Sequence, residues 1–284
     1  MDGILLIDKN SDITSRKTCD YISKKFNEKR VGHIGTLDPF ATGLLIVMLG
    51  KGNKCAQFLD DASKRYQATI KLGEKTDSLD IEGEVILKKD IPNLTKEKIE
   101  EVLNYFLGKG KQTPPMTSAV HVNGKKLYEY ARKGVEVDRP SRDIEIKEIK
   151  LIDFKEDEIT FEALVSKGTY IRVLGSDIAD RLGTVGHLKA LRRIEVASFN
   201  VNKAIKMEEI KEENILSIFD FLKKVARVHE VNEEMETKIK NGLRRYLTLS
   251  YKDKYVLIVN KNKDVVAMYK QINDNKYEFT RGLF

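Results

Sequence analysis

Residues 32–45, GHIGTLDPFATGLL, contain a single acid, Asp38, directly before Pro39. A residue that precedes proline is kept out of the helical region, so Asp38 is expected in a turn. Gly35 and Gly43 would allow a ligand or another backbone to approach closely. The lack of a second acid in this stretch disfavours paired acid–base chemistry and favours nucleophilic attack or charge stabilisation at an anomeric carbon. The alternative is an Asx-turn or a helix N-cap without chemistry.

Other reactive groups are sparse. The histidines are His33, His121, His187 and His229, and the cysteines are Cys19 and Cys55. Neither set has the spacing of metal ligands, so we expect no metal. No phosphate loop or dinucleotide fingerprint occurs either. The two distant cysteines indicate core thiols in a reducing compartment. No apolar run approaches the ~20 residues of a membrane span, and acids follow the first residues too soon for a signal peptide. We therefore expect a cytoplasmic protein with no membrane partner.

Several segments have the periodicity of elements that could position Asp38. A buried strand is expected at residues 3–10, and an amphipathic helix at 15–27. Alternating apolar residues predict a strand at 64–73, with 82–89 as its antiparallel neighbour.

Two further segments predict helices. Residues 94–108 show helical spacing of apolar side chains, with Thr95 as the N-cap and Gly108 as the stop. Residues 157–183 are expected to form a strand, a glycine turn and a helix. Arg172 would lie near the start of that last helix.

The charge balance favours a polyanionic partner. Lysine and arginine outnumber aspartate and glutamate by 51 to 44, although a lysine-rich solvated surface explains this equally well. Residues 115–143 are expected to form a projecting loop, because prolines frame them and cations alternate with aromatic residues. The mix of Lys125, Lys126, Tyr128 and Arg132 suits phosphate contact and base stacking, and an ordinary solvated hairpin is the alternative.

The C-terminal region has a different pattern. After a helix-prone stretch, short β-rich runs begin, so a domain boundary is expected near Ala226. Residues 260–264, NKNKD, are predicted to turn a hairpin there.

Four of these stretches together resemble a known family. GHIGTLDPFATGLL, KRYQATIKLG, KKLYEYARKG and SKGTYIRVLGSDIADRLG are similar, in order, to the motifs of the bacterial B-type tRNA pseudouridine synthases. The resemblance covers about residues 3–200 and implies an α+β fold, in which a mixed, mainly antiparallel sheet has flanking helices. It implies a catalytic domain at 1–225, with the loop at 115–143 as a thumb. A small β-rich, PUA-like RNA-binding domain is expected at 226–284.

The resemblance also assigns residues to the chemistry. Asp38 matches the nucleophile that attacks the target uridine nucleotide. Tyr66 matches the tyrosine that stacks on the flipped base and is a candidate for removing the carbon-5 proton. Arg172 matches the arginine that pairs with the aspartate, and this pairing predicts a lowered pKa for Asp38.

Further residues are expected to bind RNA. They are Lys9, His33, Lys64, Tyr170 and Leu191, together with Lys125, Lys126, Tyr128 and Arg132 of the thumb. Leu191 would close the base pocket, and His33 would hold neighbouring loop bases apart. The family's first motif usually has proline and glycine after the lysine, whereas Asn10, Ser11 and Asp12 follow Lys9 here.

The activity implied is isomerisation of uridine to pseudouridine at position 55 in the T loop of tRNA, with the target base flipped out. This reaction needs neither redox chemistry nor an energy source, so the resemblance implies no cofactor. We expect tRNA as the partner through its T-arm, no required protein partner, and a monomer. Two alternatives stay open at this point: a pseudouridine synthase for another RNA, and a stand-alone RNA-binding protein or tRNA-folding chaperone. The retention of Asp38, Tyr66 and Arg172 argues against the second.

Overall fold

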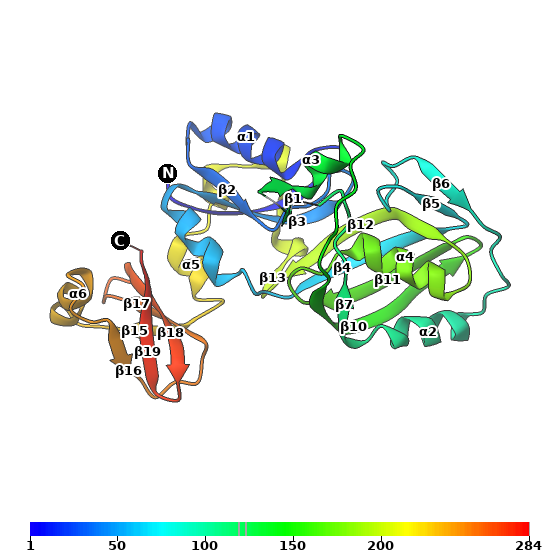
Figure 1. Ribbon diagram of the computed structural model, residues 1–284. Coiled ribbons are helices and arrows are strands. Elements are labelled where there is room, and N and C mark those ends of the chain that lie inside the picture. The colour runs from blue at the N-terminus through cyan, green and yellow to red at the C-terminus, as the bar shows by residue number, and fades with distance from the viewer. Residues whose placement is uncertain (119, 123, 284) are drawn as a thin grey trace.

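The computed structural model describes residues 1–118, 120–122 and 124–283 (Figure 1). Positions 119 and 123 of the expected thumb, and position 284 of the expected C-terminal domain, lie outside the described residues. Within the described residues, a ten-stranded sheet and a five-stranded sheet dominate the fold, and two short hairpins accompany them.

The larger sheet is mixed and mainly antiparallel, as predicted. Its strand order is β14-β1-β3-β12-β4-β11-β10-β7, with β2 added to β3 and β13 to β12. The β1–β14 and β3–β12 pairs are parallel. Its strands are β1 (Gly3–Lys9), β2 (Val31–Ile34), β3 (Thr42–Leu49), β4 (Lys64–Leu72), β7 (Gly108–Gln112), β10 (Arg142–Lys155), β11 (Glu158–Val165), β12 (Gly186–Val196), β13 (Phe199–Asn200) and β14 (Ile205–Lys206).

Three helices bury their apolar faces against this sheet. They are α1 (Ser15–Phe26), α2 (Lys96–Tyr105) and α4 (Ile171–Arg181). The predicted helices are confirmed, and Thr95 caps α2 by accepting from the Lys98 amide. The end of α2 differs: Phe106 is its C-cap, and Gly108, with φ +98°, already begins β7. The apolar stripes of these helices and one face of the sheet form a single core.

The expected pairing of residues 82–89 with 64–73 is wrong. The segment forms β6 (Val85–Lys88), which pairs with β5 (Glu74–Thr76) in a separate hairpin. Strand β4 instead lies between β11 and β12. All four residues of β6 are exposed, whereas alternate residues of β4 are buried, so β4 needs apolar neighbours that β6 cannot provide.

The C-terminal sheet has the order β15-β17-β18-β19-β16. Its strands are β15 (Arg227–Glu230), β16 (Tyr246–Thr248), β17 (Tyr255–Val259), β18 (Val265–Asn273) and β19 (Lys276–Gly282), accompanied by α6 (Glu233–Lys240). The predicted turn at 260–264 joins β17 to β18, which confirms it. The boundary near Ala226 stays a prediction, because Leu257 and Met268 of this sheet share one core with Phe58 and with Phe221 of α5 (Ile218–Leu222).

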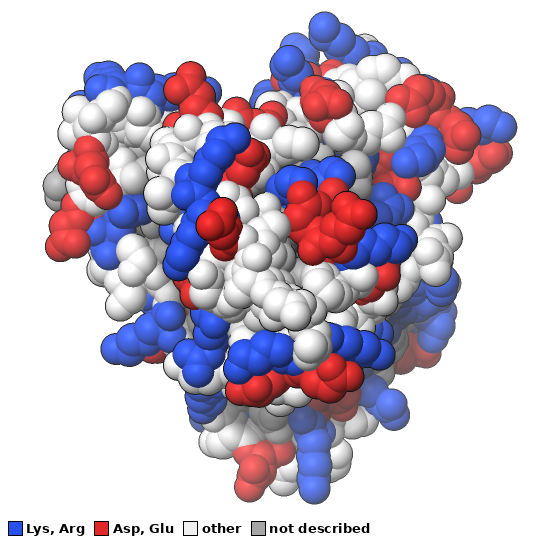
Figure 2. Space-filling model, turned by 90° about the vertical axis from the view of Figure 1, so that its right-hand side faces the viewer, with Lys and Arg blue, Asp and Glu red and all other residues white. Residues whose placement is uncertain are grey.

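Short 3-10 helices complete the described chain. They are η1 (Gly50–Phe58), η2 (Val201–Lys203), η3 (Met207–Glu209) and η4 (Glu212–Asn214). On the face that Figure 2 shows, lysine and arginine side chains are interspersed with acidic ones rather than gathered into one basic patch. In the part of the chain that the structure describes, no helix is long and apolar enough to cross a membrane.

Candidate active site

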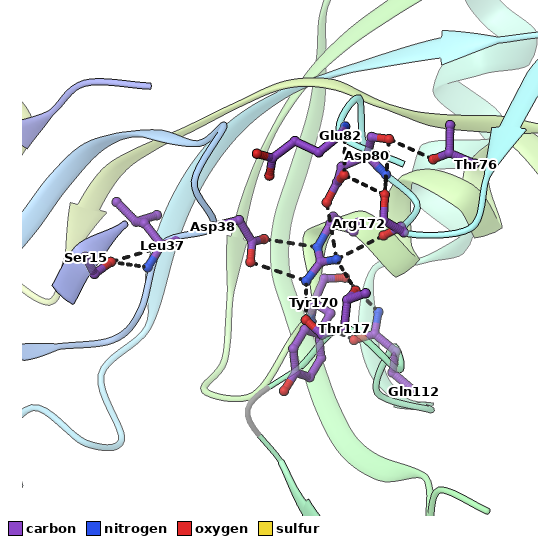
Figure 3. A network of polar contacts seen from close by, with 11 residues as sticks. Ser15, Leu37, Asp38, Thr76, Asp80, Glu82, Gln112, Thr117, Tyr170 and Arg172 are labelled. Atoms are coloured by element: carbon purple, nitrogen blue, oxygen red, sulfur yellow. Dashed lines mark hydrogen bonds and ion pairs between the residues drawn. The ribbon is translucent and has the colours of Figure 1, made fainter. Parts of the chain in front are cut away.

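Asp38 lies in the turn between β2 and β3, next to Leu37, which contacts Ser15 (Figure 3). Contacts on both sides hold this turn in place. The Ser15 hydroxyl donates to the Leu37 carbonyl at 3.1 Å and accepts from the Leu37 amide at 2.9 Å. On the other side, Lys9 Nζ donates to the Pro39 carbonyl at 3.0 Å. The carboxylate is therefore presented from a fixed backbone, which favours a defined attack geometry.

Arg172 pairs with Asp38 in two-point geometry. Its Nε lies 3.0 Å from Asp38 Oδ2, and its Nη2 lies 3.3 Å from Oδ1. Arg172 is the second residue of α4, as the sequence predicts, and its side chain is 4% exposed while that of Asp38 is 32% exposed. A guanidinium bound in this way fixes the carboxylate's orientation as well as its charge.

A second carboxylate, Asp80, holds the other side of Arg172. Its Oδ2 lies 3.2 Å from Arg172 Nη1, and it is itself fixed by the Glu82 amide at 3.1 Å and the Ser78 hydroxyl at 2.6 Å. Arg172 Nη1 also donates to the Thr117 hydroxyl at 2.6 Å. Sequence reasoning missed Asp80, because an aspartate in a turn after β5 is typical of loops and carries no signal of its own.

The pKa of Asp38 is raised, in contrast to the lowering that its pairing with Arg172 predicts. Burial of the carboxyl group is the main cause, and the negative charge of Asp80 adds to it. The charges of Arg172 and Lys9 oppose the shift without reversing it. The expectation failed because it counted only the opposite charge and left out the cost of removing the carboxylate from water.

The residues that the sequence motifs assign to catalysis line one cavity of about 480 Å³. Asp38, Tyr66 and Arg172 contribute to its wall, and so do the expected RNA-binding residues Lys64, Tyr128, Tyr170 and Leu191. This volume lies within the usual range for a small-molecule site, ~300 to 1,000 Å³. The structure thus brings these residues together from five separate segments of the chain.

Tyr66 and Leu191 lie on neighbouring strands at the cavity wall. Tyr66 of β4 pairs in register with Ala163 and Arg193, and Leu191 of β12 pairs with Ala68. Tyr66 is 8% exposed and Leu191 is 7% exposed, so each presents an apolar surface at the edge of the core. Their predicted roles in stacking on a base and closing its pocket stay predictions.

Two expected RNA-binding residues, Lys9 and His33, lie outside the lining of this cavity. Lys9 is 1% exposed, and its Nζ donates to the carbonyls of Asn10, Ile13 and Pro39. It therefore closes the altered loop after β1 onto the Asp38 turn, and its contact with RNA stays a prediction. His33 is half-buried on β2, and its Nδ1 has no hydrogen-bond partner among the described residues. Burial and the charges of Arg193 and Arg16 lower the pKa of His33, which favours the neutral ring.

The thumb contains a small aromatic and cationic cluster. Its described residues form β8 (His121–Val122), β9 (Lys125–Lys126) and α3 (Leu127–Ala131). Lys126 Nζ and Arg132 Cζ lie 5.6 and 5.3 Å from the centre of the Tyr128 ring. Lys125 and Arg132 are exposed, so the cluster faces both the cavity, through Tyr128, and solvent.

A mixed sheet that carries an arginine-clamped aspartate at a cavity in its middle is the arrangement of a pseudouridine synthase. The fold agrees: a solved Cbf5–Nop10–Gar1 complex contains a chain that superposes with a TM-score of 0.73, covering 99% of this chain and 85% of that one at 21% identity. The fold class predicted from the sequence, with a β-rich C-terminal part, is confirmed.

The chain belongs to the TruB family of pseudouridylate synthases. The family's N-terminal domain matches residues 23–171, and a tRNA pseudouridylate synthase B C-terminal domain matches residues 172–237. The tRNA pseudouridine synthase B of Hydrogenovibrio crunogenus is 43% identical over 245 residues, which are 85% of this chain and 80% of that protein. That of Mesoplasma florum is 34% identical over 281 residues, 99% of this chain and 97% of that protein. The resemblance inferred from the sequence motifs is thereby confirmed.

Proposed function

We propose that this protein isomerises uridine to pseudouridine at position 55 in the T loop of tRNA, with Asp38 as the nucleophile. The observation that carries the proposal is the Asp38–Arg172 pair at the wall of a cavity that Tyr66 and Leu191 also line. A binding protein or chaperone would gain nothing from a partly exposed carboxylate held in two-point geometry. The shared name of the relatives, tRNA pseudouridine synthase B, supports tRNA over another RNA.

The reaction conserves atoms and electrons. Asp38 attacks the bound uridine nucleotide and forms a covalent bond to it, the bond between the sugar C1′ and the base N1 breaks, and the base turns. C5 then bonds to C1′, and the bond to Asp38 breaks, which restores the free carboxylate. The C5 proton then leaves, and N1 takes up a proton. No redox group or energy source is required, and we propose that no cofactor participates.

The residues around Asp38 have different roles in this reaction. Arg172 orients the carboxylate and balances its charge, while Asp80 keeps Arg172 in place. Tyr66 stacks on the extruded base, which recovers part of the free energy lost on unstacking, and Leu191 closes the pocket. Only ionised Asp38 is nucleophilic, so its raised pKa means that activity falls as the pH drops towards that value.

The target base must leave the T loop to reach Asp38. Extrusion costs a few kcal/mol and is least costly for loop nucleotides, so loop shape selects the substrate more than sequence does. The thumb cluster around Tyr128 would contact the RNA from above the cavity.

We infer that the protein acts as a monomer without a protein partner, since the residues assigned to the reaction all come from one chain. We place it in the cytoplasm, where tRNA and reduced thiols such as the free Cys19 and Cys55 occur.

The decisive experiment is incubation of the purified protein with unmodified tRNA, followed by mapping of pseudouridine. We expect one modified position, uridine 55, and an equally good reaction on an isolated T-arm hairpin. The same hairpin with its target uridine locked in a duplex should react much more slowly. Binding of tRNA without any pseudouridine would favour the chaperone alternative, and modification elsewhere would identify another RNA target.

A further inference from the structure

Arg193 is fully buried beside the active site, and it is not among the residues assigned above to catalysis or to RNA binding. Its side chain is 0% exposed and contributes to the wall of the cavity that holds Asp38. Nε donates to the Leu44 carbonyl at 2.8 Å, and Nη2 donates to the Gly35 carbonyl at 2.9 Å. Nη1 is buried and has no hydrogen-bond partner among the described residues.

The charge of Arg193 is not balanced by an acid. Arg172, the other buried arginine of the cavity, has two carboxylates within 3.2 Å. Arg193 forms no ion pair within the residues that the structure describes, and carbonyl groups alone accept its hydrogen bonds. A buried cation is costly unless an anion pairs with it, so this site is incomplete in the free protein.

Other basic groups lie close enough to Arg193 to interact with its charge. Burial lowers the pKa values of Lys9, Lys64 and His33, and the positive charge of Arg193 lowers them further. Burial and Arg193 together bring the pKa of Lys64 to about 8. Such a convergence of positive groups raises the free energy of the free protein, and a bound anion would relieve it.

We propose that Arg193 and Lys64 form a phosphate subsite, which binds the phosphodiester next to the uridine that enters the cavity. The inference rests on the proposed function, since it takes RNA as the ligand. It adds a specificity that the catalytic residues lack: they act on a uridine, whereas this subsite requires the nucleotide to be part of a chain.

The backbone geometry supports a close approach of the RNA chain. Arg193 pairs across the sheet with Tyr66, and cross-strand partners project on the same side. Gly35, with φ +64°, has no side chain beside these groups: an added Cβ would lie 3.2 Å from Arg193 Nη1 and 3.4 Å from Lys64 Cε. Lys64 Nζ donates to the Ala62 carbonyl at 3.1 Å. An ammonium has three donors. Rotation of this flexible side chain towards a phosphate would expose Nη1 to the same oxygen atoms.

A purely structural role for Arg193 is the competing explanation, because it ties Gly35 to Leu44. A neutral hydrogen-bond donor could serve that purpose without burying a charge. Arg192, the next residue, is the natural comparison: its guanidinium binds both oxygens of Asp8 at 2.9 and 3.0 Å, so its charge is already balanced.

The test uses T-arm RNA in which single phosphates next to the target uridine are replaced by neutral methylphosphonates. Each RNA is bound to the parent protein and to the variants Arg193→Gln, Lys64→Gln and Arg192→Gln. Binding of the T-arm hairpin is measured in an Asp38→Asn background, so that turnover does not interfere. One neutral linkage should weaken binding about tenfold with Arg193 and Lys64 intact, and less than about twofold once Arg193 is replaced. Arg192→Gln should keep the full tenfold sensitivity.

The proposal would be overturned if a neutral linkage weakened binding equally with and without Arg193. It would also be overturned if no neutral linkage weakened binding to the parent protein. If thermal melting shows that Arg193→Gln does not fold, Lys64→Gln decides, because unchanged sensitivity in that variant also overturns the proposal. The binding assay does not depend on catalysis. A parent enzyme that binds the hairpin but forms no pseudouridine would refute the proposed function while leaving the phosphate result intact.

Discussion

The two sheets of this protein differ in whether charged side chains are buried beside them. Beside the large sheet, Lys9, Asp80, Arg172 and Arg193 are all at most 4% exposed. In the described residues 227–283, the buried side chains are aliphatic, apart from Met268, Tyr269 and Tyr277. The hydroxyl of Tyr277 donates to the carbonyls of Tyr251 and Asp253, so even this polar group is satisfied.

This difference is the one expected between a region that carries a reactive site and a region whose buried residues serve folding. Burying an ion costs free energy that apolar packing does not, so a cluster of buried ions is retained where a ligand or a reaction needs it. The C-terminal sheet has the composition of a folding core. The two regions also share apolar contacts, so removal of the C-terminal sheet would expose Phe58 and Phe221. Point substitutions in the full chain therefore test the comparison better than truncation does.

The largest effect should come from Asp38→Asn. Removing the nucleophile should lower single-turnover pseudouridine formation by about 10⁴-fold or more, because no other group can replace it. The affinity for tRNA should stay within several-fold, since binding is spread over many phosphates. A quench-flow assay with a binding titration measures both, and residual turnover close to the wild-type rate would remove Asp38 from the mechanism.

Arg172→Lys should have the next largest effect. Lysine keeps the positive charge but cannot hold Asp38 at two points and bind Asp80 as well, so we expect the chemical step to slow about 100-fold. Thermal melting is the control for folding. If only tRNA affinity fell, with single-turnover rates at saturation unchanged, Arg172 would be a phosphate contact instead.

Asp80→Asn should slow the reaction about tenfold, because Arg172 then keeps only one of its two anionic anchors. It should also change the pH profile. The charge of Asp80 raises the pKa of Asp38, so its removal lowers that pKa, and the acid limb of kcat/KM moves to lower pH. An acid limb that stays in place would show that the two carboxylates are not coupled.

The smallest effect should come from the C-terminal region. Lys224 and Arg227 line a hollow of about 520 Å³ beside the C-terminal sheet. If they bind phosphates, replacing both with Gln should weaken tRNA binding several-fold without changing the rate at saturation. The slope of log affinity against log salt concentration should fall by ~0.7 to 0.9 for each phosphate that is no longer neutralised. Lys261→Gln with Lys263→Gln is the matched control, because these lysines pair with Glu233 and Glu230. An identical response in both double variants would point to a general charge effect.

The sequence by itself determined the local elements and indicated which residues are candidates for catalysis. Apolar residues at helical spacing predicted α1, α2 and α4, and the cap at Thr95 formed as predicted, because these features depend on neighbours a few residues apart. The proline after Asp38 indicated a turn for the same reason. The ordered motifs around Asp38, Tyr66 and Arg172 were enough to indicate the family.

Only the tertiary structure decided which strands pair and which charges meet. β6 joined β5 rather than β4, because pairing depends on which apolar faces can be buried together. The contact between Asp80 and Arg172 joins positions far apart in the chain, and Arg193 differs from the ion-paired Arg192 only by the face of β12 on which it lies. The raised pKa of Asp38 likewise follows from burial and from Asp80, neither of which is local. Electrostatic free energy depends on distance and solvent exposure in space, and neither quantity can be read from residue spacing.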